Sequence, residues 1–117
     1  MNRDIKFRAW DEVSEKMLNW NEFLDTNMKN TFIAPESTGL ILMQYTGLHD
    51  KNGKEKYEGD IVKYENMTGK IMFFNGSFIL SDLEETEEWE LGVINEDIEV
   101  IGNIYDNPEL LGGEDGI

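Results

Sequence analysis

The stretch LMQYTGLHDKNGKEKYEGDIVKY, residues 42–64, decides how this chain is expected to fold. Apolar and aromatic residues at both of its ends enclose a polar segment, DKNGK, at residues 50–54. Asn-Gly at 52–53 is a strong signal for a hairpin turn. Gly59 then interrupts the pattern before a second apolar run at residues 61–64. The stretch therefore predicts a long β-hairpin that leads into a small curved sheet.

Composition predicts one folded domain that spans residues 1–117. A hydrophobic content of 39% with 11% aromatic residues provides for a core, and the length is that of a single domain. The chain has no cysteine, which excludes disulfides and cysteine metal sites and fits a reducing compartment. No apolar run approaches the roughly 18 residues that a membrane helix needs, and the start of the chain lacks a signal-peptide pattern. We therefore expect a cytoplasmic protein that does not associate with membranes.

The charge balance argues against direct binding of nucleic acid. Twenty-five acidic residues against ten basic ones give a formal net charge of −15. Affinity for DNA comes mainly from cationic neutralisation of phosphates, so such a chain would need its bases clustered. Lys51, Lys54, Lys56 and Lys63 do gather in the opening stretch. The simpler interpretation is that they are solubilising charges on an exposed hairpin and sheet edge.

The N-terminal part predicts a hairpin followed by a poorly defined region. Apolar and polar residues alternate at 5–10, and a return strand is expected at 17–20. Signals in residues 21–39 are weak: a short helix early on, a short strand at 32–33 and a loop from Pro35. We expect this region to be irregular and mobile.

The rest of the chain predicts a meander of short strands. Asn75-Gly76 is a second hairpin signal, and a turn is expected at residues 66–69. A turn of helix at 107–111, capped by Asn107, and a disordered tail at 112–117 should close the chain. The expected strands are 40–45, 61–64, 70–74, 77–80 and 98–105, and the expected core is Ile61, Ile71, Phe73, Phe78, Leu80, Val100 and Ile104.

The fold class that follows is mainly β, either all-β or β-rich α+β. We expect a small bent antiparallel sheet or an SH3-like barrel built from residues 40–105, with the N-terminal hairpin packed against it and a few short helical turns. Consecutive strands joined by short turns are typical of such barrels.

No convincing catalytic or metal-binding set is present. His49 is the only histidine, and it lies beside a turn. A calcium loop that started at Asp50 would need Gly at its sixth position and Glu at its twelfth, but here the glycine falls at the fourth and Ile61 at the twelfth. Glu58 and Asp60 could form a carboxylate pair, although carboxylates at a turn more often accept backbone N–H groups. We expect no cofactor, no metal and no catalytic residue.

The acidic run at residues 82–90 has three interpretations. It could be a solvated loop or a solvated helix capped by Ser81 or Asp82, a site for a basic partner anchored by an aromatic side chain, or a mimic of the DNA phosphate backbone. The candidate partner surface consists of Trp89, Glu84, Glu85, Glu87 and Glu88.

Five blocks of the sequence stand out: IKFRAWD at 5–11, MQYTGL at 43–48, DKNGK at 50–54, YEGDIV at 57–62 and IGNIYDNPELL at 101–111. Taken together and in order, they resemble the YopX family of phage and prophage proteins. The resemblance implies a phage or prophage origin, expression in the cytoplasm of a bacterial host and a mainly β fold. It implies no activity and transfers no catalytic residue.

The resulting functional hypothesis is a non-enzymatic module that binds a host or phage protein. One alternative is an acidic DNA mimic that inhibits a DNA-binding protein. Another is an enzyme acting on nucleic acid or nucleotide, which would need a pocket joining His49, Asp50, Glu58 or Asp60. Exposed strand edges would also allow a homo-oligomer.

Overall fold

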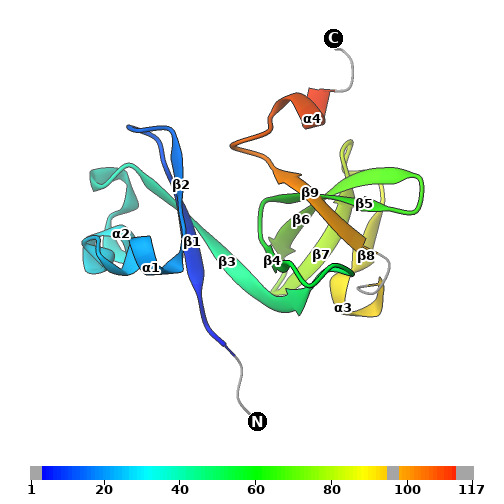
Figure 1. The fold of residues 1–117 in the computed structure, drawn as a ribbon, viewed down its shortest axis with the longest axis horizontal. Coiled ribbons are helices and arrows are strands. Elements are labelled where there is room, and N and C mark those ends of the chain that lie inside the picture. Colours follow the sequence, from blue (N-terminus) through cyan, green and yellow to red (C-terminus); the bar gives the residue numbers. More distant parts are fainter. Residues whose placement is uncertain (1–3, 95–97, 113–117) are drawn as a thin grey trace.

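The computed structural model describes residues 4–94 and 98–112. Two curled antiparallel sheets form a half-barrel, with short helices at its margins (Figure 1). The mainly β prediction is therefore confirmed. Among the described residues, none of the helices is long and apolar enough to cross a membrane.

The first sheet contains the N-terminal hairpin and has the strand order β2-β1-β3-β4. The predicted hairpin is confirmed, but it does not pack against a completed sheet: its first strand pairs edge to edge with β3, from Phe7 opposite Gln44 to Asp11 opposite Leu40. The predicted return strand ends before Trp20, which starts a helix instead. The strands are β1 (Phe7–Asp11), β2 (Lys16–Leu18), β3 (Leu40–His49) and β4 (Glu55–Tyr57).

Between β2 and β3 the chain is helical, so the short helix expected early in this region is confirmed, whereas the irregular structure and the strand at 32–33 are wrong. The elements there are α1 (Trp20–Leu24), α2 (Met28–Ile33) and the 3-10 turn η1 (Pro35–Ser37). The Asn19 side chain accepts from the Glu22 N–H, and Glu22 accepts from the Asn19 N–H, which forms a capping box. Asn27 caps α2 in a similar way. Buried Phe23 then packs these helices onto β1 and β3.

The second sheet has the order β8-β7-β6-β5-β9 and forms the curled half on the right of Figure 1. The turn at Asn75 and Gly76, both with positive φ, is confirmed. The turn expected at 66–69 is shorter, because β6 already begins at Met67. The elements of this half are β5 (Asp60–Tyr64), β6 (Met67–Phe74), β7 (Ser77–Asp82), β8 (Glu88–Glu90), α3 (Leu91–Ile94) and β9 (Ile98–Asn103).

Of the two expected structures for the acidic run, the helix is not formed, and a turn followed by a short strand takes its place. β7 continues to Asp82, whose Oδ1 accepts from the backbone N–H groups of Thr86 and Glu87, and the chain returns as β8. Asp82 is therefore a cap, as proposed, but of a turn between strands. The alternation Glu88-Trp89-Glu90 places the aromatic ring on the core face of β8.

The predicted core is correct at its centre and wrong at its margin. Ile61, Ile71, Leu80 and Val100 are buried, while Phe78 and Ile104 are half-buried. Phe73 is 46% exposed. It lies close to the Asn75-Gly76 turn, where β6 and β7 extend beyond the core.

After β9 the chain passes back between the two sheets. The last strand ends at Asn103 rather than at 105, and α4 (Glu109–Gly112) follows. The side chain of Asn107 does not cap this helix; it accepts from the Asn103 N–H at 3.1 Å. Gly112 belongs to α4, which corrects the start of the expected tail, and residues 113–117 lie outside the described residues.

Candidate functional site

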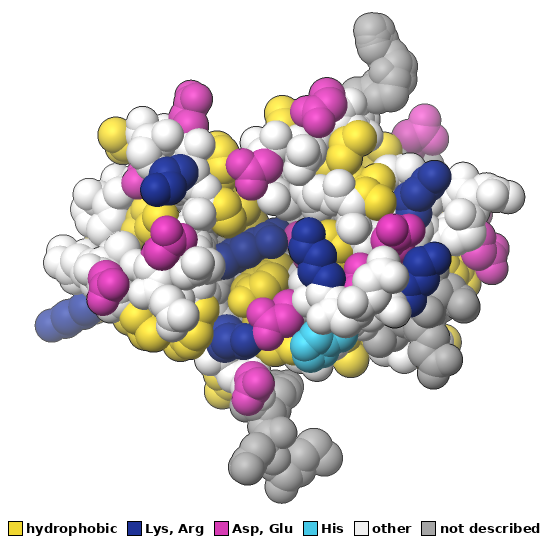
Figure 2. Space-filling view, in the orientation of Figure 1, with side chains coloured by type: hydrophobic (Ala, Val, Ile, Leu, Met, Phe, Trp, Pro, Cys, Tyr) yellow, Lys and Arg dark blue, Asp and Glu magenta, His cyan; other side chains and the backbone are white. Residues whose placement is uncertain are grey.

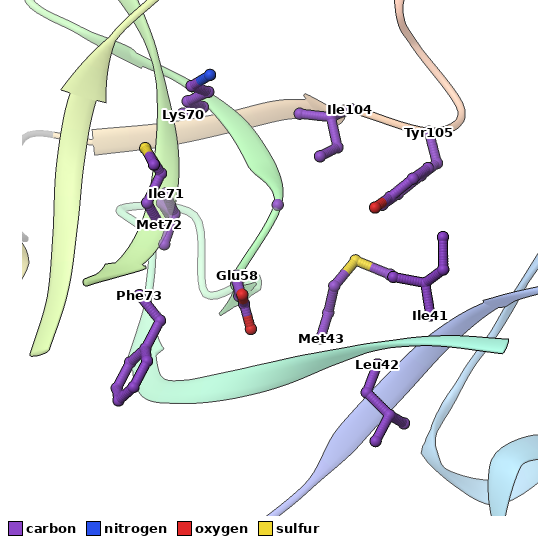
Figure 3. A pocket seen from close by; sticks show the side chains of 11 residues that line it. Ile41, Leu42, Met43, Glu58, Lys70, Ile71, Met72, Phe73, Ile104 and Tyr105 are labelled. Atoms are coloured by element: carbon purple, nitrogen blue, oxygen red, sulfur yellow. The ribbon is translucent and has the colours of Figure 1, made fainter. Parts of the chain in front are cut away.

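A groove lies between the two sheets, and we call it the inter-sheet groove (Figure 3). It encloses about 250 Å³, several times the roughly 30 Å³ that one water molecule occupies in the liquid. Ile41 and Met43 extend into it from β3, opposite Ile104 and Tyr105. The full lining is Ile41, Leu42, Met43, Glu58, Gly59, Lys70, Ile71, Met72, Phe73, Ile104 and Tyr105.

The base of the groove depends on a glycine. Gly59 has φ +90°, and a Cβ at this position would lie 3.0 Å from Sδ of Met43. Its N–H donates to Ile71 O and its carbonyl accepts from the Ile104 N–H, both at 2.9 Å. Residues 57–60 link the first sheet to the second. A residue without a side chain is therefore needed at position 59, where this link passes Met43 of β3.

A second hollow, the acidic cleft, adjoins the groove at Tyr105. The Tyr105 ring stacks on Trp10 with the centroids 5.4 Å apart and the planes 17° apart. Burial raises the pKa of the Tyr105 hydroxyl, and the charges of Glu58 and Glu12 raise it further, so this hydroxyl stays neutral at pH 7. The cleft encloses about 650 Å³ and is lined by Trp10, Glu12, Glu15, Tyr105, Asp106, Pro108 and Glu109.

The carboxylate pair suggested by the sequence has a structural role. Asp60 is buried: its Oδ1 accepts from Arg8 Nη2 at 2.8 Å and its Oδ2 from the Tyr57 N–H at 2.8 Å. Burial raises the pKa of Asp60, although Arg8 opposes this. Glu58 Oε1 accepts from the Gln44 N–H. Of the four residues that a nucleotide enzyme would bring together, only Glu58 lines the groove, and none lines the acidic cleft.

Asp50 and His49 are likewise occupied by local contacts. Asp50 accepts from the N–H groups of Asn52, Lys54 and Val100, and so ties the β3–β4 turn to β9. Burial would raise the pKa of Asp50, but these three donors lower it overall. The exposed His49 ring meets Tyr45 edge-on, 6.1 Å between centroids.

The expected patch of four lysines is interrupted. Lys51, Lys54 and Lys63 are exposed, but Lys56 is completely buried, and this burial lowers its pKa to about 8 despite the charges of Asp50 and Asp60. Lys51 pairs with Glu99 at 3.9 Å. Figure 2 shows Lys and Arg side chains across the middle of one face, interspersed with acidic ones. The bases therefore do not form a continuous basic surface on that face.

A further polar contact joins Lys6, the residue before β1, to β4 of the same sheet. Lys6 pairs with Glu55, and its Nζ lies 4.8 Å from the centroid of the Tyr45 ring. The hydrogen bond to Glu55 is the main reason that the pKa of Lys6 is raised. Within residues 4–94 and 98–112, no three metal-binding side chains gather in a way that could hold an ion.

The candidate partner surface lies on β8 and the turn before it. Trp89 is half-buried against the core, with its ring 6.0 Å from that of Tyr64. Glu84, Glu85, Glu87 and Glu88 are exposed, and Glu85 pairs with Lys70 at 2.7 Å. The carboxylates of this surface therefore face solvent, while its aromatic anchor packs inward.

The sequence alone did not point to the groove or to the acidic cleft. Both depend on how the two sheets are oriented and on the path of residues 104–109 between them. The available signals were Trp10, which falls on the polar face of its strand, and Tyr105 within the block IGNIYDNPELL. Neither residue indicates by itself that the other is its partner.

These features define a class of mainly β protein: two curled antiparallel sheets with a groove between them. The model of the YopX protein family matches residues 6–112, and the chain belongs to this family. The structure is similar to that of protein EF1440 from Enterococcus faecalis, with 29% identity, 94% of this chain and 99% of that chain covered, and a TM-score of 0.65. It is also similar to protein yopX from Bacillus subtilis, with 25% identity, 92% and 96% covered, and a TM-score of 0.59. A comparison with curated proteins gives no match.

Proposed function

We propose that this chain is a non-enzymatic interaction module of a phage or prophage that binds a protein in the cytoplasm of the bacterial host. The observation that carries the proposal is the inter-sheet groove, whose lining is mostly apolar and whose rim includes Phe73, 46% exposed. Phe74 beside it is 52% exposed. Exposed apolar surface that borders a preformed groove is typical of sites for protein partners.

The polar groups near the groove support binding rather than chemistry. Glu58, the carboxylate that lines it, is bonded to the Gln44 N–H. Lys70 at the other side is paired with Glu85. General acid–base catalysis needs a positioned group that is available to the substrate, and both groups already have partners within the chain.

Photo-crosslinking in bacterial cells tests the proposal. A benzoylphenylalanine at position 73 would sample the groove, and one at position 87, where the side chain is exposed, would sample the acidic partner surface. One at Val93 is the control for the groove, since Val93 is 80% exposed and lies on α3, which contributes no residue to the groove lining. We expect a covalent adduct with one cellular protein from position 73 and none from position 93. An adduct from position 87 alone, with a DNA-binding protein, would favour mimicry instead. No adduct at either site, together with turnover in a nucleotide substrate screen, would overturn the proposal.

A further inference from the structure

We propose that the inter-sheet groove and the acidic cleft form one docking site for a protein segment that carries an apolar side chain close to Lys or Arg. This inference rests on the proposed function and names the chemistry of the partner. The two hollows share Tyr105, which lines both of them. A segment that lies across Tyr105 can therefore use both at once.

The groove accounts for the apolar part of the ligand. Ile41, Met43 and Ile104 point into it, and it is large enough for a side chain rather than only for water. At its far side Lys70 and Glu85 form an ion pair without net charge, so this end offers little attraction to a cation. A cationic side chain of the ligand is thus favoured at the Tyr105 end and not at the Lys70 end.

The cleft accounts for the basic part through charge complementarity. Four of its lining residues are acidic (Glu12, Glu15, Asp106 and Glu109) and none is basic. In the part of the chain that the structure describes, no ion pair joins any of these four carboxylates to Lys or Arg. Opposite charges that are brought together across an interface favour the correct partner and its orientation.

The aromatic pair gives the cleft a means of holding a cation that a cluster of carboxylates lacks. Trp10 and Tyr105 are stacked and both line the cleft. Guanidinium groups stack on aromatic faces, and Trp is the strongest such partner. The combination selects a basic segment over a second copy of this chain, whose net charge of −15 would be repelled by the same carboxylates.

NMR titration of the ¹⁵N-labelled full chain with synthetic probes tests the inference. The first probe is a Gly/Ser peptide with one Phe and two Arg; the second replaces Arg by Glu, and the third replaces Phe by Ser. We expect the first to shift the Trp10 indole N–H and the amides of Ile104 and Tyr105. The third should bind about tenfold more weakly, and the second should not shift these signals.

A matched pair of charge variants distinguishes binding in the cleft from attraction to the overall negative charge of the chain. Glu12→Gln/Glu109→Gln neutralises two exposed carboxylates in the cleft, and Glu84→Gln/Glu87→Gln neutralises two exposed carboxylates near β8. The first variant should lose about tenfold in affinity for the Phe/Arg probe and the second should lose less than twofold. Equal losses, equal binding of the Arg and Glu probes, or shifts confined to other parts of the chain would overturn the inference.

The two proposals fail in distinguishable ways. If position 73 crosslinks a cellular protein but the probes do not bind in the cleft, the proposed interaction function stands. The inference that the partner segment is basic is then wrong. If the Phe/Arg probe binds at Tyr105 but position 73 yields no protein in cells, the interaction function through the groove is wrong.

Discussion

Nη2 of Arg8 lies 2.8 Å from Oδ1 of Asp60, and this buried ion pair joins β1 of the first sheet to β5 of the second. The two side chains are only 12% and 2% exposed. The same nitrogen also donates to the carbonyl of Glu58 at 3.3 Å, and the guanidinium lies 4.8 Å from the centre of the Tyr57 ring. Arg8 therefore holds the whole link between the sheets, residues 57–60, against β1.

Substitution Arg8→Ala should destabilise the fold strongly. It leaves Asp60 charged and buried without its cation, and breaking a buried pair by removing one partner costs about 3–5 kcal/mol. Urea unfolding followed by circular dichroism measures the loss. Lys16→Ala on neighbouring β2 is the control, because Lys16 is exposed, and it should change stability by less than about 0.5 kcal/mol. Equal effects of the two substitutions would contradict a structural role for the pair.

Asp50→Ala should release the β3–β4 turn from β9. The substitution removes the acceptor of three backbone N–H groups, those of Asn52, Lys54 and Val100. Hydrogen bonds to a charged group contribute about 1.5–3 kcal/mol each and are not additive, so we expect a total loss of about 3 kcal/mol. Hydrogen exchange at the Val100 amide should accelerate. Lys54→Ala keeps the backbone donor and should leave that exchange rate unchanged.

The same aspartate gives a prediction for acid conditions. The pKa of Asp50 is lowered from 3.8 in the folded state. The stabilisation is therefore fully present above the unfolded pKa, and it is lost as the pH falls below it and through the folded pKa. In Asp50→Asn the free energy of unfolding should fall less steeply below about pH 4 than in the unchanged protein. The same pH dependence in both proteins would show that Asp50 does not contribute to it.

Lys56 should make the protein more stable in mildly alkaline solution. Its pKa is lowered from 10.5 to about 8 by burial, so between these values the unfolded state binds more protons than the folded state and stability rises with pH. At about 1.4 kcal/mol per pH unit, the gain from pH 8 to pH 9.5 is about 2 kcal/mol. Above pH 10 the raised pKa values of Tyr45, Tyr57 and Tyr105 act in the opposite direction.

Urea unfolding at pH 7, 8, 9 and 9.5 would measure the Lys56 effect. Lys56→Met should remove the rise while keeping the fold. The slope with pH is the diagnostic quantity, because the substitution also changes packing. A rise that persists in the variant would assign it to other groups.

Two glycines form a matched pair for testing strand packing. A Cβ on Gly69 would lie 2.6 Å from the carbonyl oxygen of Ser81 and 2.8 Å from Cδ1 of Leu80. Gly69→Ala must therefore push β6 and β7 apart, at a cost of about 1–3 kcal/mol. A Cβ on Gly92 in α3 meets no atom within 4 Å, so Gly92→Ala should be neutral or stabilise by up to about 1 kcal/mol. Thermal unfolding of both variants measures the difference, and a tolerated Gly69→Ala would contradict the observed β6–β7 spacing.

Much of the sheet structure follows from local sequence, because tight turns depend on a few residue types. Gly53 and Asn75-Gly76 adopt the positive φ angles that their hairpins require. Residues 21–39 predict one short helix, whereas the structure has two, Trp20–Leu24 and Met28–Ile33. Propensity does not predict the second, because Asn27 and Asn30 are weak helix formers. Asn27 in fact serves as a cap. Caps carry more information than propensities in helices this short.

The acidic strand and the two hollows were missed for different reasons. Glu88-Trp89-Glu90 alternates with the period of a strand, but so dense a run of acids is also compatible with a solvated helix or loop, and the pairing with β7 decides between them. The groove and cleft join Met43, Gly59 and Tyr105, which are distant in sequence. Their proximity depends on how one sheet is oriented on the other, and no local pattern encodes that orientation.

The order of the strands along the chain has a consequence for folding. Every strand pair of the first sheet lies within residues 7–57, and every pair of the second lies within residues 60–103. Each sheet can therefore close its own loops before the other exists. The polar ties of Arg8 to Asp60, of Asp50 to Val100 and of Lys51 to Ile98 join residues of both halves, so they must wait until both have formed. Native-state hydrogen exchange should then resolve two cooperative units, with the junction that forms the groove opening at the lowest free energy.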